Sequence, residues 1–105
     1  MAEPARHEIW WCELPDRKAR PYLVLTRDHA IPVLRRLVAA PVTRTVRGIP
    51  TELPLGPDEG LPVESVASFD NVETVPKVAL TRRIGAVAPA REHEVCSAYR
   101  AATDC

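Results

Sequence analysis

The fold of this chain is decided by two stretches, RPYLVLTRD at residues 20–28 and LVAAPVTRTVRG at residues 37–48. Each contains a near-continuous apolar run of the length of a buried strand. Arg20 stands just before the first run and Thr43 closes the second, so if the strands pair, both polar groups lie near one rim of a small sheet. A guanidinium there supplies charge and forked donors, and a hydroxyl adds a hydrogen bond. This pairing suits a phosphate diester and predicts a phosphodiester-cleaving site.

Length and composition predict one domain over residues 1–105. The chain is 46% hydrophobic, enough for one modest core. No run approaches the roughly 18 apolar residues of a membrane span, and the N-terminus lacks a signal-peptide core. We therefore expect a soluble, cytoplasmic protein. Its cysteines, Cys12, Cys96 and Cys105, are too few and too widely spaced for a disulfide framework or a zinc set, so we interpret them as reduced thiols and expect no metal or cofactor.

The net charge is zero, but the charges are unevenly distributed. Residues 16–48 contain eight basic and two acidic residues, a net charge of +6, whereas residues 49–76 contain six acidic residues and no basic one. Neutrality argues against a generic nucleic-acid binder. A basic segment inside a neutral protein can still form a local surface that attracts phosphate. The alternative is that these charges only solvate exposed strands.

The pattern of apolar residues and breakers predicts mostly strands. Besides the buried run at 22–25, strands are expected at 8–14, 36–43, 51–55, 65–69, 71–75 and 80–87. Residues 28–31 are expected to form one helical turn. A C-terminal helix is expected to begin at Pro89, with an apolar stripe of Val95, Ala98, Tyr99 and Ala102 facing the core. Several short strands and one helix favour a small, strongly bent, barrel-like sheet.

Six segments in order resemble the MazF/PemK toxins and span nearly the whole chain. They are EIWW (8–11), RPYLVL (20–25), APVT (40–43), GIPTE (48–52), FDNVETVP (69–76) and RIG (83–85). The resemblance implies a mainly β fold, an SH3-like barrel of five to seven strands with a C-terminal helix, assembled as a homodimer. It also implies an mRNA interferase that cleaves single-stranded RNA at short specific sequences without a metal. A cognate MazE-like antitoxin would block the RNA groove.

By the same resemblance, Arg20 and Thr43 match the family's catalytic arginine and threonine, and Trp10, Asp70 and Asn71 match positions near the RNA groove. Five residues of the basic segment complete the predicted RNA-binding set: Arg17, Lys18, Arg44, Thr45 and Arg47. The alternation of Trp10 and Trp11 does not itself say which of the two faces a groove. Asp70-Asn71 could equally form a turn.

One residue departs from the family pattern: His7 stands where the family usually has glycine. The loop 15–19 is also short, and since it helps to read bases in relatives, the resemblance does not extend to a cleavage sequence.

Cleavage would proceed by attack of a ribose 2′-OH on its neighbouring phosphate, leaving a 2′,3′-cyclic phosphate and a 5′-OH. Arg20 and Thr43 can stabilise the phosphorane, but a guanidinium is a poor base and no histidine pair is evident, so the groups that move protons are not assigned. Two other functions stay open. One is a toxin of the same fold that binds a protein such as DNA gyrase without cutting RNA, and the other is a non-catalytic SH3-like interaction module.

Overall fold

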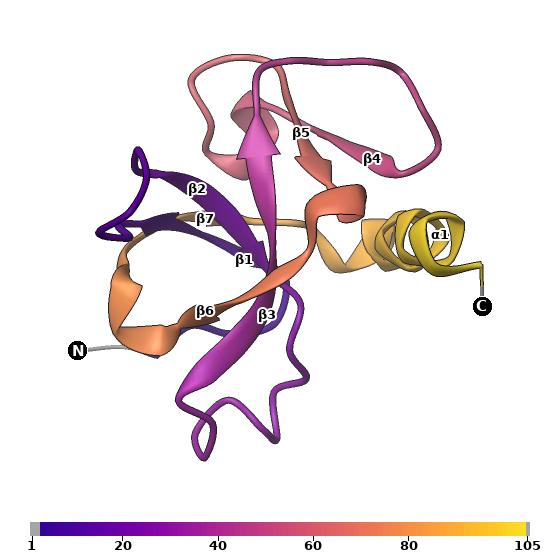
Figure 1. Cartoon of the computed structure of the whole chain (residues 1–105). Coiled ribbons are helices and arrows are strands. Elements are labelled where there is room, and N and C mark those ends of the chain that lie inside the picture. The colour runs from indigo at the N-terminus through magenta and orange to yellow at the C-terminus, as the bar shows by residue number, and fades with distance from the viewer. Residues whose placement is uncertain (1–2, 105) are drawn as a thin grey trace.

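The computed structural model describes residues 3–104 and shows a curled antiparallel sheet with a C-terminal helix, α1 (Figure 1). Its elements are β1 (Glu8–Cys12), β2 (Arg20–Val24), β3 (Arg36–Thr43), β4 (Glu52–Leu55), β5 (Ser65–Ser68), β6 (Glu73–Pro76), β7 (Leu80–Ala86) and α1 (Glu92–Thr103). The predicted mainly β fold, a small barrel-like sheet with a C-terminal helix, is confirmed. Cys105 lies outside the described residues.

The sheet curls because β3 has different partners along its length. The strand order is β4-β5-β3-β2-β1-β7, and β6 lies off this path beside β3. Residues 36–39 of β3 pair with β6, whereas Val42 and Thr43 pair with β5, and β2 lies along the opposite edge. A strand shared in this way bends the sheet into a half-barrel.

Two apolar clusters lie on opposite sides of β2, which explains why its sequence does not alternate. Leu23 packs into one cluster, together with Ile9 and Val95. Tyr22 and Val24 pack into the other. The last three residues of β2, Tyr22, Leu23 and Val24, are each at most 1% exposed. A strand segment buried on both faces is apolar at successive positions.

The C-terminal helix differs from the prediction in two respects. Pro89 begins a one-turn 3₁₀ helix, Pro89–Arg91, and α1 itself starts at Glu92. Val95 and Ala98 are buried and Ala102 packs against the core, but Tyr99 is 48% exposed. The apolar stripe is therefore narrower than predicted, because Tyr99 lies at its edge.

Two shorter predictions also needed correction. Residues 28–31 form turns rather than a helical turn. The strand expected at 71–75 begins at Glu73, because Phe69–Asn71 forms a 3₁₀ turn of its own. A turn at Asp70-Asn71 is thus what the structure contains.

The unusual residue His7 lies in the left-handed region, with φ of 68°. Its N–H donates to the Val24 carbonyl at 2.8 Å, and its own carbonyl accepts from the Val87 N–H at 2.9 Å. The first strand thus enters the sheet through a backbone conformation that glycine adopts without cost. This accounts physically for the glycine of the family pattern.

Candidate functional site

Arg20 and Thr43 lie at one rim of the sheet, as the sequence predicted. In the antiparallel pairing of β2 with β3, Tyr22 is opposite Pro41. Extending that register by two residues places Arg20 opposite Thr43, and both side chains line the same two adjacent cavities. The rim therefore presents a guanidinium and a hydroxyl to a shared space.

The larger cavity has a volume of about 550 Å³. It is lined by Trp11, Lys18, Ala19, Arg20, Pro21, Val42, Thr43, Arg44, Thr45, Gly60, Leu61, Pro62, Ser65, Arg82 and Ile84. Four of these residues are basic and none is acidic. Within residues 3–104, none of the four, Lys18, Arg20, Arg44 and Arg82, makes an ion pair. Such a cavity attracts an anion of compact charge.

The smaller cavity, of about 380 Å³, continues the site beyond Arg20, Thr43 and Thr45, which it shares with the larger one. Arg17, Arg47 and Asn71 join it here, but so does the carboxylate of Glu52. That carboxylate accepts the backbone N–H groups of Arg47 and Gly48 at 2.9 and 3.0 Å, which fixes the middle of the loop between β3 and β4.

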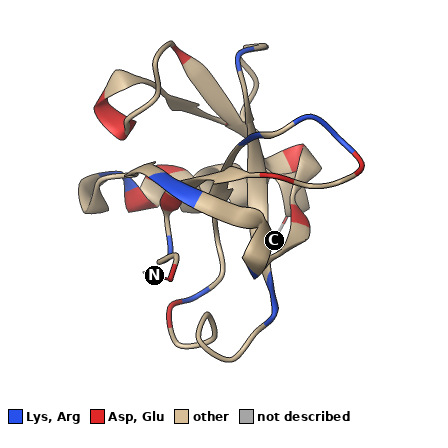
Figure 2. Cartoon of the chain, turned by 90° about the vertical axis from the view of Figure 1, so that its left-hand side faces the viewer, with Lys and Arg blue, Asp and Glu red and all other residues tan. Residues whose placement is uncertain are grey.

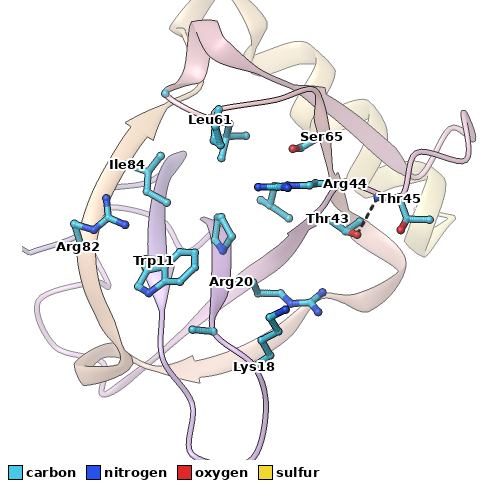
Figure 3. Close-up of a pocket in the computed structure, with 15 residues that line it drawn as sticks. Trp11, Lys18, Arg20, Thr43, Arg44, Thr45, Leu61, Ser65, Arg82 and Ile84 are labelled. Carbon is cyan, nitrogen blue, oxygen red and sulfur yellow. Dashed lines mark hydrogen bonds between the residues drawn. The ribbon is translucent and has the colours of Figure 1, made fainter.

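Thr43 is oriented by its own loop. The Thr45 N–H donates to Thr43 Oγ1 at 3.1 Å (Figure 3). With that bond filling an acceptor position, the hydroxyl keeps its proton for a further acceptor. The hydroxyl therefore satisfies a backbone group and can still donate to a phosphate oxygen.

Arg17 is less available to bind an anion than its position in the basic segment suggested. Its Nη1 lies 2.8 Å from Glu73 Oε2, and the same carboxylate oxygen accepts the Tyr22 hydroxyl at 2.8 Å. Burial raises the pKa of Tyr22, and Glu73 raises it further. The charge of Arg17 is thus partly neutralised beside the cavity.

Two of the predicted RNA-binding residues line neither cavity of the site. Trp10 is 7% exposed and donates its indole N–H to Glu8 Oε1 at 3.0 Å. Asp70 accepts the Thr51 hydroxyl at 2.7 Å. The half-buried Trp11 lines the larger cavity instead.

The positive character of the site is local. Figure 2 shows basic and acidic residues interspersed along the loops and strands of the ribbon. Arg82, which was not among the predicted site residues, comes from β7, outside the predicted basic segment. Of the residues on the basic segment, Arg27 lines a separate cavity beside α1, which also contains His7.

In the part of the chain that the structure describes, no three His, Cys, Asp or Glu side chains form a group that could hold a metal ion. Within the same residues, no helix is both long and apolar enough to cross a membrane.

Comparison with known proteins places the chain in a family. A sequence model described as "PemK-like, MazF-like toxin of type II toxin-antitoxin system" matches residues 5–102. The probable endoribonuclease MazF5 of Mycobacterium tuberculosis is 44% identical over 105 residues, which is 99% of this chain and 96% of the relative. The chain therefore belongs to the PemK-like, MazF-like toxins, as its six segments predicted.

Solved structures agree with this assignment. The Mycobacterium tuberculosis toxin MazF-mt6 superposes with a TM-score of 0.86 at 40% identity, over 92% of this chain and 96% of that one. An endoribonuclease from a mycobacterial species, solved in complex with its cognate antitoxin, gives a TM-score of 0.85 at 31% identity, over 96% and 95% of the two chains.

Proposed function

We propose that residues 1–105 form a single-domain cytoplasmic mRNA interferase, the toxin of a type II toxin–antitoxin pair. It cleaves single-stranded RNA at short specific sequences and acts as a homodimer. The observation that carries the proposal is the juxtaposition of Arg20 and Thr43 in a cavity where, among residues 3–104, four basic side chains make no ion pair and no carboxylate lines the wall. The names of its relatives, endoribonucleases and an antitoxin-bound toxin, support the same function.

The proposed reaction is attack by a ribose 2′-OH on the adjacent phosphorus. The P–O2′ bond forms as the P–O5′ bond breaks, which leaves a 2′,3′-cyclic phosphate and a 5′-OH. Arg20 donates to the nonbridging oxygens of the phosphorane, and the Thr43 hydroxyl, oriented by the Thr45 N–H, donates to one of them. These two donors need no metal, so the reaction should run in excess chelator.

An antitoxin that blocks this site has to compete with RNA. We propose an acidic, partly disordered antitoxin segment that folds on binding, since such a segment matches the charge of the cavity. Its affinity should fall with salt, because salt screens the basic side chains that hold it.

The test is cleavage of a long single-stranded RNA in EDTA, with the product ends mapped. We expect Arg20→Ala and Thr43→Ala each to lower the single-turnover rate by about 100-fold or more, because each removes a donor to the transition state. Thr43→Ser should retain most activity, since it keeps the hydroxyl. Arg27→Ala and Thr74→Ala are matched controls, exposed and outside both cavities of the site.

A folded Arg20→Ala or Thr43→Ala variant that cuts at the wild-type rate would contradict the assigned roles. Cleavage of an RNA with deoxyribose at the cut would exclude attack by the 2′-OH. If the wild-type chain cuts no RNA, a toxin that binds a protein partner becomes the better explanation.

A further inference from the structure

The two adjacent tryptophans of β1 have opposite surroundings. In the pairing of β1 with β7, Trp10 is opposite Arg83 and Trp11 is opposite Arg82. Directly opposed residues of an antiparallel pair project from the same face of a sheet, so the two pairs lie on opposite faces. Each face thus carries one indole beside one guanidinium.

The Trp10–Arg83 pair is fully engaged within the protein. Glu8 accepts the Trp10 indole N–H at 3.0 Å with Oε1 and the Arg83 Nε at 2.8 Å with Oε2. Burial raises the pKa of the Glu8 carboxyl, but the hydrogen bonds from Trp10 and Arg83 contribute to a net lowering of that pKa. Glu8 thus links the two side chains of this pair through its carboxylate.

The Trp11–Arg82 pair has no such partner. The Arg82 guanidinium carbon lies 5.8 Å from the centroid of the Trp11 ring, within the range of a cation–π contact. Within residues 3–104, neither the Trp11 indole N–H nor the Arg82 guanidinium donates a hydrogen bond, and Arg82 makes no ion pair. A flat aromatic face and a charged planar group therefore remain at the cavity wall.

The larger cavity has two chemically different sides. Figure 3 shows Trp11, Arg82 and Ile84 on one side, and Lys18, Arg20, Thr43 and Arg44 on the other. The first side is aromatic and apolar apart from Arg82, and the second carries the charges and the hydroxyl. A nucleotide has the same two parts, an apolar base face and an anionic phosphate.

We propose that Trp11 is a stacking platform for an unpaired nucleobase beside the scissile phosphate, with Arg82 as its cationic neighbour. This inference rests on the proposed function, because it requires a single-stranded RNA substrate. Every base has a π face, so such a platform holds a base in position without selecting its identity. It acts by orienting the nucleotide whose phosphate Arg20 and Thr43 contact.

The experiment removes the base and the platform separately. Once the cut has been mapped, each nucleotide around it is replaced in turn by an abasic one. For the wild-type chain, one position should lose about 10- to 100-fold in kcat/KM, the usual effect of losing one stacked base. Trp11→Leu should show a similar loss on intact RNA and no further loss when that position is abasic.

Controls come from the neighbouring pair. Arg82→Gln should weaken RNA binding and reduce its salt dependence, whereas Arg83→Gln, on the opposite face, should leave both unchanged. Sedimentation of Trp11→Leu should match the wild type. A change in oligomeric state with equal losses on all substrates would overturn the platform and assign Trp11 to a subunit contact.

Fluorescence separates this inference from the proposed function. The chain has two tryptophans. Oligouridine should quench the tryptophan fluorescence of the Trp10→Phe variant, in which only Trp11 emits. It should not quench the fluorescence of the Trp11→Phe variant, in which only Trp10 emits. If the wild type cuts no RNA but this pattern of quenching is observed, base stacking on Trp11 is supported and the proposed nuclease activity is contradicted. If RNA is cut but abasic substitution lowers kcat/KM equally for the wild type and for Trp11→Leu, base stacking on Trp11 is contradicted and the nuclease activity is supported.

Discussion

Substitution of Gly85 tests how the wall of the larger cavity is held. A Cβ built on Gly85 would lie 1.9 Å from the Glu59 carbonyl oxygen and 2.7 Å from its carbon. From the other side, a Cβ on Gly60 would lie 2.4 Å from the Ile84 carbonyl oxygen. Two backbones thus touch where β7 meets the turn before Leu61 and Pro62, which line the cavity. Gly85→Ala should therefore be strongly destabilising.

The size of the effect follows from that contact. An ordinary separation of 3.4 Å would require a shift of about 1.5 Å between the backbones. Glu59 resists the shift, because it is 7% exposed and its carboxylate accepts the Gly56 N–H at 2.6 Å and Arg91 Nη1 at 3.2 Å. Overpacking costs about 1–3 kcal/mol, and a contact with fixed backbone belongs at the upper end. We expect a loss of about 2–3 kcal/mol in unfolding free energy.

Gly48→Ala is the matched control. Gly48 has φ of 70°, but a Cβ there would meet nothing within 4 Å. Its left-handed conformation costs alanine about 1–2 kcal/mol, and the stiffer unfolded chain offsets about 0.4–1 of that. Since 1 kcal/mol shifts Tm by about 4–8 °C in a domain of this size, Gly85→Ala should lower Tm by about 10–20 °C and Gly48→Ala by about 5 °C.

The assay is thermal unfolding followed by circular dichroism at one fixed protein concentration, because the proposed dimer would make Tm depend on concentration. A Gly85→Ala variant that melts within about 3 °C of Gly48→Ala would refute the reasoning. That result would mean that the turn and β7 separate freely.

Two further predictions concern the first strand. His7→Gly should be more stable than His7→Ala by about 1 kcal/mol in urea unfolding, since only glycine adopts φ of 68° without strain; equal stabilities would contradict this. Cys12 should alkylate far more slowly than the exposed Cys96 at about pH 8, as measured by peptide mass spectrometry, because burial raises the Cys12 pKa to about 11. Equal alkylation rates would show that Cys12 is not buried. The same shift of the Cys12 pKa means that its contribution to the free energy of unfolding is present below about pH 9 and is lost as the pH rises towards 11.

Local patterns were sufficient to predict the meeting of Arg20 and Thr43. Two apolar runs of strand length that follow each other along the chain favour neighbouring strands, and antiparallel pairing places the start of one strand beside the end of the next. The same logic predicted most of the sheet. The catalytic roles of the two residues stay a prediction.

The choice between the tryptophans could not be made in this way, because apolar clusters cover both faces of β1 and alternation alone does not tell which indole is fully covered. The pairing of β1 with β7 shifts register between Ile9 and Trp10 and again between Trp11 and Cys12. Ile9 and Trp10 are nevertheless both buried, because they project from opposite faces of β1 into different apolar clusters. Arg82 was missed for a related reason, since only the cross-strand register with Trp11 brings it to the cavity.

Segment charge predicted the site imperfectly because charge acts through space. The basic segment contains Arg17, whose charge is shared with Glu73, and Arg27, which lies at another cavity. Arg82 of β7, which lies outside that segment, lines the cavity instead.

The revised set, Lys18, Arg20, Arg44 and Arg82, comes from three separated segments that the curl of the sheet brings together. A neutral protein can therefore hold a phosphate strongly at one place while most of its surface stays indifferent to RNA. An acidic inhibitor faces the same four charges, so a competing antitoxin and the substrate should respond alike when any one of them is removed.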